Sequence, residues 1–286
     1  MLKNTFLHIP RIGYKTEKKL WKHGFISWQD YLEKCDSCPV HSLPKEIVVN
    51  HIETSAKALA HNNARYFEER LNAGDAWRFY ADFRNSVAFV DIETTGLYSR
   101  SDAITVVGLF DGRSTKVFIQ GRNLQDFGEE VKKYSLLVTF NGKRFDLPFI
   151  RSVFGELPPL QGHIDLLYPL RQFGYRGGLK SIERQIGLER EGSLKKADGY
   201  LAVLLWREHV RGNKTALNTL IRYNLEDVVN LQYLADWVYN EGTSRLPIHP
   251  DRLPTPSKYD VDAPFDEELV EYLSRAIEEQ RFNRSY

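Results

Sequence analysis

The ten residues Ala88-Phe-Val-Asp-Ile-Glu-Thr-Thr-Gly-Leu97 carry two acids, Asp91 and Glu93, between an apolar run and a glycine. Side chains two residues apart in a β-strand point to the same face, so both carboxylates are expected to project together from a buried strand. Two like charges about 4 Å apart repel by ~4 kcal/mol at an effective dielectric of about 20. A cation, a proton or open solvent must compensate, and a metal ion is the first candidate.

Two later segments add further acids. Residues 135–140 form a short apolar run that favours a strand, and the turn after it leads to Asp146 at the expected start of a helix. Residues 215–239 show helical periodicity, with Tyr223 and Asp227 spaced i, i+4 on one face. Three segments far apart in the chain therefore each offer carboxylates, and the third also offers a phenol.

In their order and spacing, these segments resemble the three exonuclease motifs of the DnaQ-like 3′–5′ exonuclease superfamily. The matching stretches are Val90–Gly96, Asn141–Asp146 and Tyr223–Asp227, within residues 84–240. The chain is also similar to the YprB-like ribonuclease H-like proteins of that superfamily, in the residues His163–Leu167, Gly177–Ile182 and Tyr223–Asn230. The resemblance implies an α/β, ribonuclease H-like fold with a mixed five-stranded sheet and flanking helices.

The four acids fit a metal-dependent phosphodiesterase. Carboxylates alone make a hard, oxygen-rich site that suits Mg²⁺ or Mn²⁺, and two such ions about 4 Å apart can activate a water and stabilise the leaving oxygen. The resemblance implies that Asp91 bridges two metals and that Glu93 and Asp227 hold the metal that activates the water. It implies that Asp146 acts through water on the other metal.

The resemblance gives Tyr223 the role of orienting the attacking water. The sister subtype has a histidine five residues before the last aspartate, where this chain has Arg222, so the tyrosine (DEDDy) subtype is favoured. A plainer alternative is that Tyr223 and Asp227 form a packing or hydrogen-bonded pair. Glu226 lies about a quarter turn from Asp227 and four residues after Arg222, so we expect it to form a solvated ion pair with that arginine.

The same motifs suggest contacts with nucleic acid. The resemblance implies that Thr95, Gly96 and Leu97 meet the 3′-terminal nucleotide, and the alternative for this stretch is a strand-to-turn connection. Asn141 and Phe145 are expected to line the strand channel, although Phe145 also fits the apolar core. His163 and Asp165 follow as cleft-lining candidates, with a helix cap at Asp165 as the plainer alternative.

The net charge of +1 argues neither for nor against a polyanionic partner, but its distribution is uneven. Residues 1–24 hold six Lys or Arg against one acid, residues 171–196 hold seven against three, and residues 241–286 hold ten acids against six bases. Basic segments beside an acidic metal site suit nucleic acid, whereas charge runs are more often solvated helix faces. The candidates along one channel edge are Arg171, Arg176, Lys180 and Arg184.

Residues 6–24 resemble a helix-hairpin-helix element, whose Pro-x-x-Gly hairpin offers backbone amides to a DNA phosphate. Gly13 and Lys15 are the candidate contacts there. The alternative is a small helical packing unit with Trp21 and Trp28 in its core.

Cys35 and Cys38 form a single Cys-x-x-Cys without a second pair, so ordinary thiols are expected. The low cysteine content, with no signal segment and no long apolar run, predicts a soluble cytoplasmic protein without a membrane partner.

Three parts are predicted along the chain: a helical module over 1–75, a ribonuclease H-like exonuclease domain over 76–240, and a Pro-rich linker with an acidic helix over 241–286. Strands are expected near 86–92, 103–110, 116–120 and 135–140, with a further one ending near Ile164. Helices are expected near 45–73, 123–133, 143–154, 178–186, 197–210, 214–239 and 265–281.

The interpretation is a two-metal-dependent 3′–5′ exonuclease that acts on a single-stranded 3′ end. The residues do not discriminate DNA from RNA, because gripping phosphates and stacking an end does not read the 2′-hydroxyl. Two alternatives stay open: a structure-specific or RNA-processing nuclease of the same fold, and a catalytically weak nucleic-acid-binding adaptor. The resemblance also allows a helicase partner.

Overall fold

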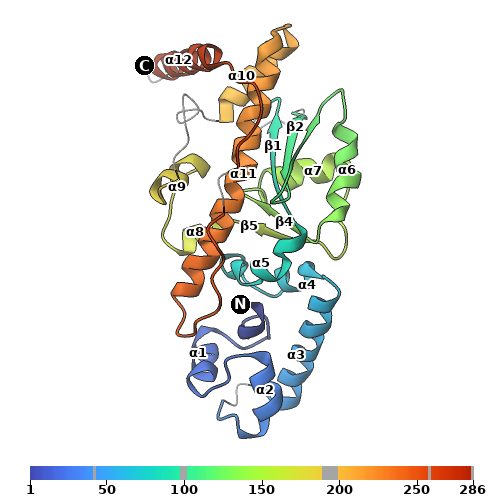
Figure 1. The fold of residues 1–286 in the computed structure, drawn as a ribbon, viewed down its shortest axis with the longest axis vertical. Coiled ribbons are helices and arrows are strands. Elements are labelled where there is room, and N and C mark those ends of the chain that lie inside the picture. The colour runs from blue at the N-terminus through green and yellow to red at the C-terminus, as the bar shows by residue number, and fades with distance from the viewer. Residues whose placement is uncertain (41–42, 97–101, 189–198, 257–258, 285–286) are drawn as a thin grey trace.

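A mixed five-stranded sheet lies at the centre of the computed structural model, which describes residues 1–40, 43–96, 102–188, 199–256 and 259–284. The strands are β1 (Val87–Thr94), β2 (Ile104–Phe110), β3 (Thr115–Ile119), β4 (Leu136–Thr139) and β5 (Gly162–Asp165). Their order across the sheet is β3-β2-β1-β4-β5 (Figure 1). The pairs β1–β2 and β2–β3 are antiparallel, and β1–β4 and β4–β5 are parallel. The predicted fold class is confirmed.

Strand β1 is apolar on both faces because both faces are covered. Phe89 packs on one side against Phe110 of β2, with ring centroids 6.2 Å apart. Val90 and Ile92 point to the other side and belong to a second apolar cluster. Asp91 and Glu93 share the face of Phe89 because strand side chains alternate. Two carboxylates are thus directed at a covered face.

Long helices cover that face. Helix α11 (Lys214–Ser244) crosses the sheet against β1 and β2, and α10 (Gly199–Val210) packs against α11 (Figure 1). The opposite face carries α6 (Phe127–Glu130) and α7 (Asp146–Phe154). The remaining helices after β5 are α8 (Leu167–Gln172), α9 (Leu179–Gln185) and α12 (Glu267–Arg284). The predicted helices near 143–154, 178–186, 197–210 and 265–281 are confirmed within a few residues. Helix α8 was not among the predicted ranges, although a helix cap at Asp165 was one alternative.

Two helix predictions need correction. Over 123–133 the helix is divided into two short 3₁₀ turns, η5 (Leu124–Asp126) and η6 (Val131–Lys133), on either side of α6. Helix α11 continues to Ser244, beyond the predicted end at residue 239, and its last turn is still packed on the core: Gly242 and Thr243 are buried, and a Cβ on Gly242 would lie 2.6 Å from the Trp77 ring.

The single long helix predicted over 45–73 is wrong. The structure has α3 (Lys45–Ala60) and α4 (Ala64–Glu68) instead. Asn62 adopts a left-handed backbone with φ 52°, a conformation that asparagine tolerates better than most residues. The Asn63 side chain then caps α4 by accepting a hydrogen bond from the Tyr66 N–H at 3.0 Å.

The N-terminal helices pack around buried indoles. The remaining elements there are η1 (Leu2–Asn4), α1 (Tyr14–Lys22), α2 (Trp28–Lys34), η2 (Cys35–Ser37), η3 (Ala73–Asp75), α5 (Trp77–Phe83) and η4 (Arg84–Ser86). Trp21 and Trp28 are both buried and donate to the carbonyls of Asn4 and Thr5 at 2.9 and 2.7 Å. One apolar cluster continues from these helices into the sheet. The boundary near residue 75 stays a prediction.

The Pro-rich segment after α11 has no helix or strand in residues 249–256 and 259–266, as predicted. It is nevertheless bound to α11. The Asn240 side chain exchanges two hydrogen bonds with the backbone of Leu253, at 2.9 and 2.8 Å, and the Tyr259 ring packs on Phe110 at 4.8 Å. Among the described helices, none combines the length and the apolar composition needed to cross a bilayer.

Candidate metal centre

Three carboxylates converge between the sheet and α11. Asp91 and Glu93 project from β1, and Asp227 projects from the α11 face that crosses it. Each residue offers an oxygen, and these oxygens all lie within 4.8 Å of one another. Glu93 and Asp227 are buried, and Asp91 is half-buried. The i, i+2 spacing in a strand and one helical position far along the chain thus meet at one point, with hard oxygen donors of the kind Mg²⁺ and Mn²⁺ prefer.

Asp146 lies beside this cluster but is bound to the backbone. It is the first residue of α7, and its Oδ1 accepts a hydrogen bond from the Ile92 N–H at 3.1 Å. Strand β4 pairs with β1 only as far as Phe89, so the Ile92 N–H needs a partner from outside the sheet. Burial raises the pKa of Asp146 to about 7. The Asp146 carboxylate therefore contacts β1 at Ile92, between Asp91 and Glu93, and is not one of the three carboxylates whose oxygens converge.

Without a metal ion, the carboxylates of this cluster repel one another. Burial, then the charges of Glu93, Asp146 and Asp227, raise the pKa of Asp91 well above its usual value. Burial and the charge of Asp227 do the same to the pKa of Glu93. Like charges removed from water favour protonation unless an opposite charge is present. This donor set therefore fits a divalent cation.

Asn224 and Gly108 complete the site, and sequence reasoning missed both. The Asn224 Nδ2 donates to Asp91 Oδ2 at 2.9 Å and to the Asp91 carbonyl at 3.2 Å. Gly108 of β2 stands opposite Asp91, and a Cβ there would lie 2.1 Å from Asn224 Oδ1. A glycine inside a β-branched strand often marks such a close approach. That pattern, at Gly108, was the available signal.

Lys180 reaches the acids from α9. Its Nζ lies 3.8 Å from the centre of the Tyr223 ring, a cation–π distance. Its charge acts against the raised pKa values of Asp91 and Glu93. Tyr223 is itself buried, one helical turn before Asp227. Lys180, one of the basic residues expected along a channel edge, is thus brought to the cluster.

Arg176, Gly13 and Lys15 are further candidates for contacts with nucleic acid. The Arg176 guanidinium is turned onto the backbone, where it donates to the carbonyls of Arg171 and Tyr175 at 2.6 and 2.8 Å. Gly13 is the exposed N-cap of α1, and Lys15 is exposed in its first turn. Figure 1 shows α1 at the opposite end of the molecule from α10 and α12.

Residues 95 and 96, which directly follow β1, lie against Asp102, whose Oδ1 is 3.4 Å from Thr95 Oγ1. The Thr95 Oγ1 accepts from the Ala103 N–H at 3.0 Å, and a Cβ on Gly96 would lie 2.5 Å from the Asp102 carboxylate. A side chain at position 96 would therefore have to displace the Asp102 carboxylate. Leu97 lies outside the described residues.

The loop before Asp146 holds the two channel candidates. Asn141 has a left-handed backbone with φ 62°, and its N–H donates to Asp165 Oδ1 at 2.7 Å. The Phe145 ring packs on Phe149 at 5.2 Å, at the edge of the apolar cluster behind β1.

The predicted ion pair between Arg222 and Glu226 is confirmed, at 2.7 Å.

The chain is similar in sequence to a known family and to a known protein. A family model described as RNase_H superfamily matches residues 88–239. The uncharacterized protein YprB of Bacillus subtilis (strain 168) is 29% identical over 170 residues, which are 52% of this chain and 40% of that protein. The chain thus spans less than half the length of that relative.

Two solved structures are also similar. The family B DNA polymerase of the hyperthermophilic archaeon Pyrobaculum calidifontis is 19% identical, with 55% of this chain and 26% of that chain covered and a TM-score of 0.41. Brucella melitensis NrnC is 21% identical, with 58% and 79% covered and a TM-score of 0.40. The family match takes in more than half of the chain, including the acids on β1 and α11, and the chain belongs to the RNase_H superfamily.

Proposed function

We propose that the protein is a metal-dependent 3′–5′ exonuclease of the DnaQ-like tyrosine (DEDDy) subtype, which hydrolyses phosphodiester bonds at the 3′ end of DNA or RNA. The observation that carries the proposal is the meeting of Asp91, Glu93 and Asp227 with oxygens within 4.8 Å of one another. Tyr223 lies one helical turn from Asp227, as the tyrosine subtype requires.

The acids would hold Mg²⁺ or Mn²⁺ ions, which when bound polarise the scissile phosphate and lower the pKa of water. Asn224 keeps the Asp91 carboxylate oriented through its 2.9 Å hydrogen bond. Asp146 is held at β1 by the Ile92 N–H. In this proposal the Tyr223 hydroxyl orients the attacking water, and the Lys180 ammonium binds a non-bridging oxygen of the phosphate.

Substrate contacts are part of the same proposal. Thr95, Gly96 and Leu97 follow the acids of β1 and would meet the terminal nucleotide, and Asn141 and Phe145 would line the path of the strand. Arg176, Gly13 and Lys15 would contact the phosphate backbone of the nucleic acid farther from the metal site. Phosphate contacts add affinity without reading sequence, so we expect weak sequence preference and strong dependence on salt.

Single-stranded DNA and RNA oligonucleotides test the proposal directly. With Mg²⁺ or Mn²⁺ and a 5′ label, we expect a ladder that shortens by single nucleotides; with a 3′ label, we expect immediate release of a labelled mononucleotide. Chelation of the metal should stop both reactions. Internal fragments would indicate an endonuclease, and tight binding without any product would indicate an adaptor; either result contradicts the proposal.

Lys180→Met is expected to lower kcat/KM by about 10- to 100-fold, because a charge-assisted hydrogen bond is worth about 1.5–3 kcal/mol. Steady-state kinetics on a 5′-labelled oligonucleotide measure the change. Lys57→Met, at an exposed position of α3, is the matched control and should be unaffected. Equal rates for Lys180→Met and the control would remove Lys180 from the site.

A further inference from the structure

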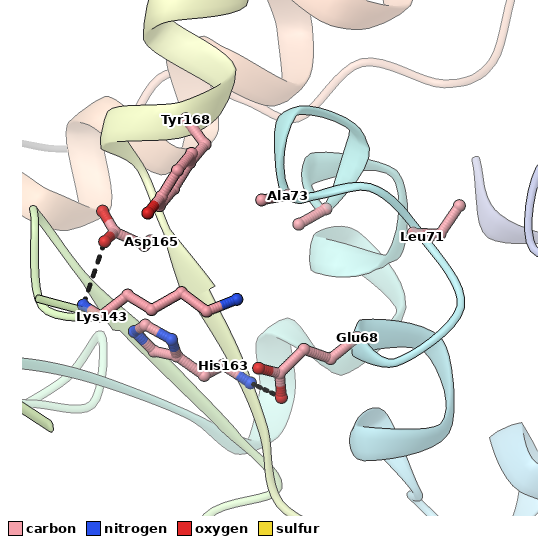
Figure 2. A pocket seen from close by; sticks show the side chains of 8 residues that line it. Glu68, Leu71, Ala73, Lys143, His163, Asp165 and Tyr168 are labelled. Carbon is pink, nitrogen blue, oxygen red and sulfur yellow. Dashed lines mark hydrogen bonds between the residues drawn. The ribbon is translucent and has the colours of Figure 1, made fainter.

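The Asp165 carboxylate, at the end of β5, accepts hydrogen bonds from the backbone of the turn that precedes Asp146. Asp165 Oδ1 accepts from the N–H groups of Asn141 and Leu167 at 2.7 and 3.1 Å, and its Oδ2 accepts from the Lys143 N–H at 3.1 Å. Figure 2 shows the bond to Lys143. Asp165 thus does more than the helix cap expected from the sequence, since two of its three donors belong to another loop.

That turn needs such support because its conformation is unusual. Asn141 has φ 62°, and a Cβ on Gly142 would lie 2.1 Å from Thr139 Oγ1. Two nearby N–H groups aimed at one carboxylate form an anion-binding concavity of the backbone. The Leu147 N–H then bonds the Gly142 carbonyl at 2.8 Å, which links the turn to the first residues of α7.

Helix α4 of the N-terminal part holds β5 in turn. Strand β5 is at the sheet edge, so its outer N–H groups need partners. The Glu68 carboxylate accepts from the His163 N–H at 2.9 Å (Figure 2). A Cβ on Gly162 would lie 2.7 Å from the Ala64 carbonyl carbon, so α4 packs directly on the strand. The His163 Nε2 lies 2.9 Å from Thr139 Oγ1.

A small cavity of about 40 Å³ lies between these groups, with Glu68, Lys143, His163, Asp165 and Tyr168 around it (Figure 2). Its walls carry both signs of charge, and its volume suits a water molecule or two at most. The cavity is therefore better explained as part of a support than as a ligand site.

We infer that Asp165 is a positioning residue: it fixes the turn at 141–145 so that Asp146 meets β1 beside the other acids, with Glu68 bracing β5 from behind. The effect of Asp165 on hydrolysis rests on the proposed function. The effect of Asp165 on metal binding can be measured without substrate. Groups that orient metal ligands typically change metal affinity or activity by about 10- to 100-fold when removed.

Asp165→Ala and Asp165→Asn test the inference in the full chain. Both should weaken Mn²⁺ binding, measured by calorimetry without substrate, and lower kcat by at least about 10-fold with KM nearly unchanged. Asparagine keeps one acceptor oxygen, so Asp165→Asn should lose less than Asp165→Ala and serves if the alanine variant does not fold. Hydrogen exchange at residues 141–147 should accelerate in both.

Asp236→Asn is the matched control, because Asp236 is a buried aspartate of α11 that accepts from Tyr80 and Arg84 at 2.8 Å. It should lower thermal stability while leaving Mn²⁺ affinity unchanged. Folded Asp165 variants that bind Mn²⁺ as tightly as the wild type would overturn the inference alone. A wild type that binds Mn²⁺ without hydrolysing any strand would overturn the proposed function alone, and one that binds no Mn²⁺ would overturn both.

Discussion

Asp91→Asn is expected to lower the rate of hydrolysis at least about 1,000-fold and, at the same time, to raise the melting temperature of the metal-free protein. Asparagine has the size of aspartate and can still accept from Asn224, so the fold around β1 should be preserved. The variant removes one charge from the three carboxylates that meet within 4.8 Å. A cation held by the remaining acids would be bound weakly and misplaced.

The gain in stability follows from the direction of the pKa shifts. Burial and neighbouring acids raise the pKa of Asp91 in the folded protein, and burial raises the pKa of Asp146 to about 7. A raised pKa contributes stability that is complete below the unfolded pKa of about 4 and is lost as the pH rises through the folded value. Metal-free wild type should therefore weaken between about pH 4 and pH 7 or above. Asp91→Asn has no titrating group at position 91, so it should lose less stability than the wild type over this pH range.

Thermal melts with and without Mg²⁺ check both parts. Mg²⁺ should raise the wild-type melting temperature in proportion to the logarithm of its concentration above Kd, and this rise should largely disappear in Asp91→Asn. Asp126→Asn, an exposed aspartate beside α6, should match the wild type in rate and in melts. Hydrolysis within tenfold of wild type, with a full Mg²⁺ response, would exclude Asp91 from the site.

The meeting of Asp91, Glu93 and Asp227 could be predicted because short-range geometry determines which way each side chain points. Alternation in a strand and the 3.6-residue turn of a helix are local rules, and apolar periodicity located both elements. The order of three motifs then identified which strand and helix face each other. Spacing gave the direction of each side chain, and the resemblance to the exonuclease motifs was needed to predict that the three acids meet.

The groups that support the acids could not be predicted in the same way. Asn224 reaches Asp91 only because Gly108, on a different strand, has no side chain. Asp165 serves the 141–145 turn through backbone N–H groups, which every residue type except proline supplies. Such contacts depend on tertiary approach, so no periodicity records them. The break at Asn62 was missed for a related reason, since helix-favouring residues flank one left-handed asparagine.

Arg78→Leu is expected to lower the free energy of unfolding by about 3–5 kcal/mol, because removing one partner of a buried ion pair leaves an uncompensated charge. Arg78 on α5 is 3% exposed, and its guanidinium lies 3.1 Å from Glu17 and 3.4 Å from Asp75, both 1% exposed. The same guanidinium donates to Thr5 Oγ1 at 3.1 Å. One side chain therefore joins α1, η1 and η3 to the helix that leads into β1.

Urea denaturation measures this loss, and two further variants interpret it. Arg245→Leu breaks a half-exposed pair with Glu241 and should cost less than about 1 kcal/mol. Glu17→Gln combined with Arg78→Leu removes both charges, so the double variant should be more stable than the sum of the single effects. A loss below about 1 kcal/mol for Arg78→Leu alone would contradict the buried network. Burial raises the pKa of Glu17, and the charge of Arg78 opposes that rise, so the pKa should rise further in Arg78→Leu. Protonation of Glu17 at low pH should therefore reduce the loss, and the deficit should grow as the pH rises.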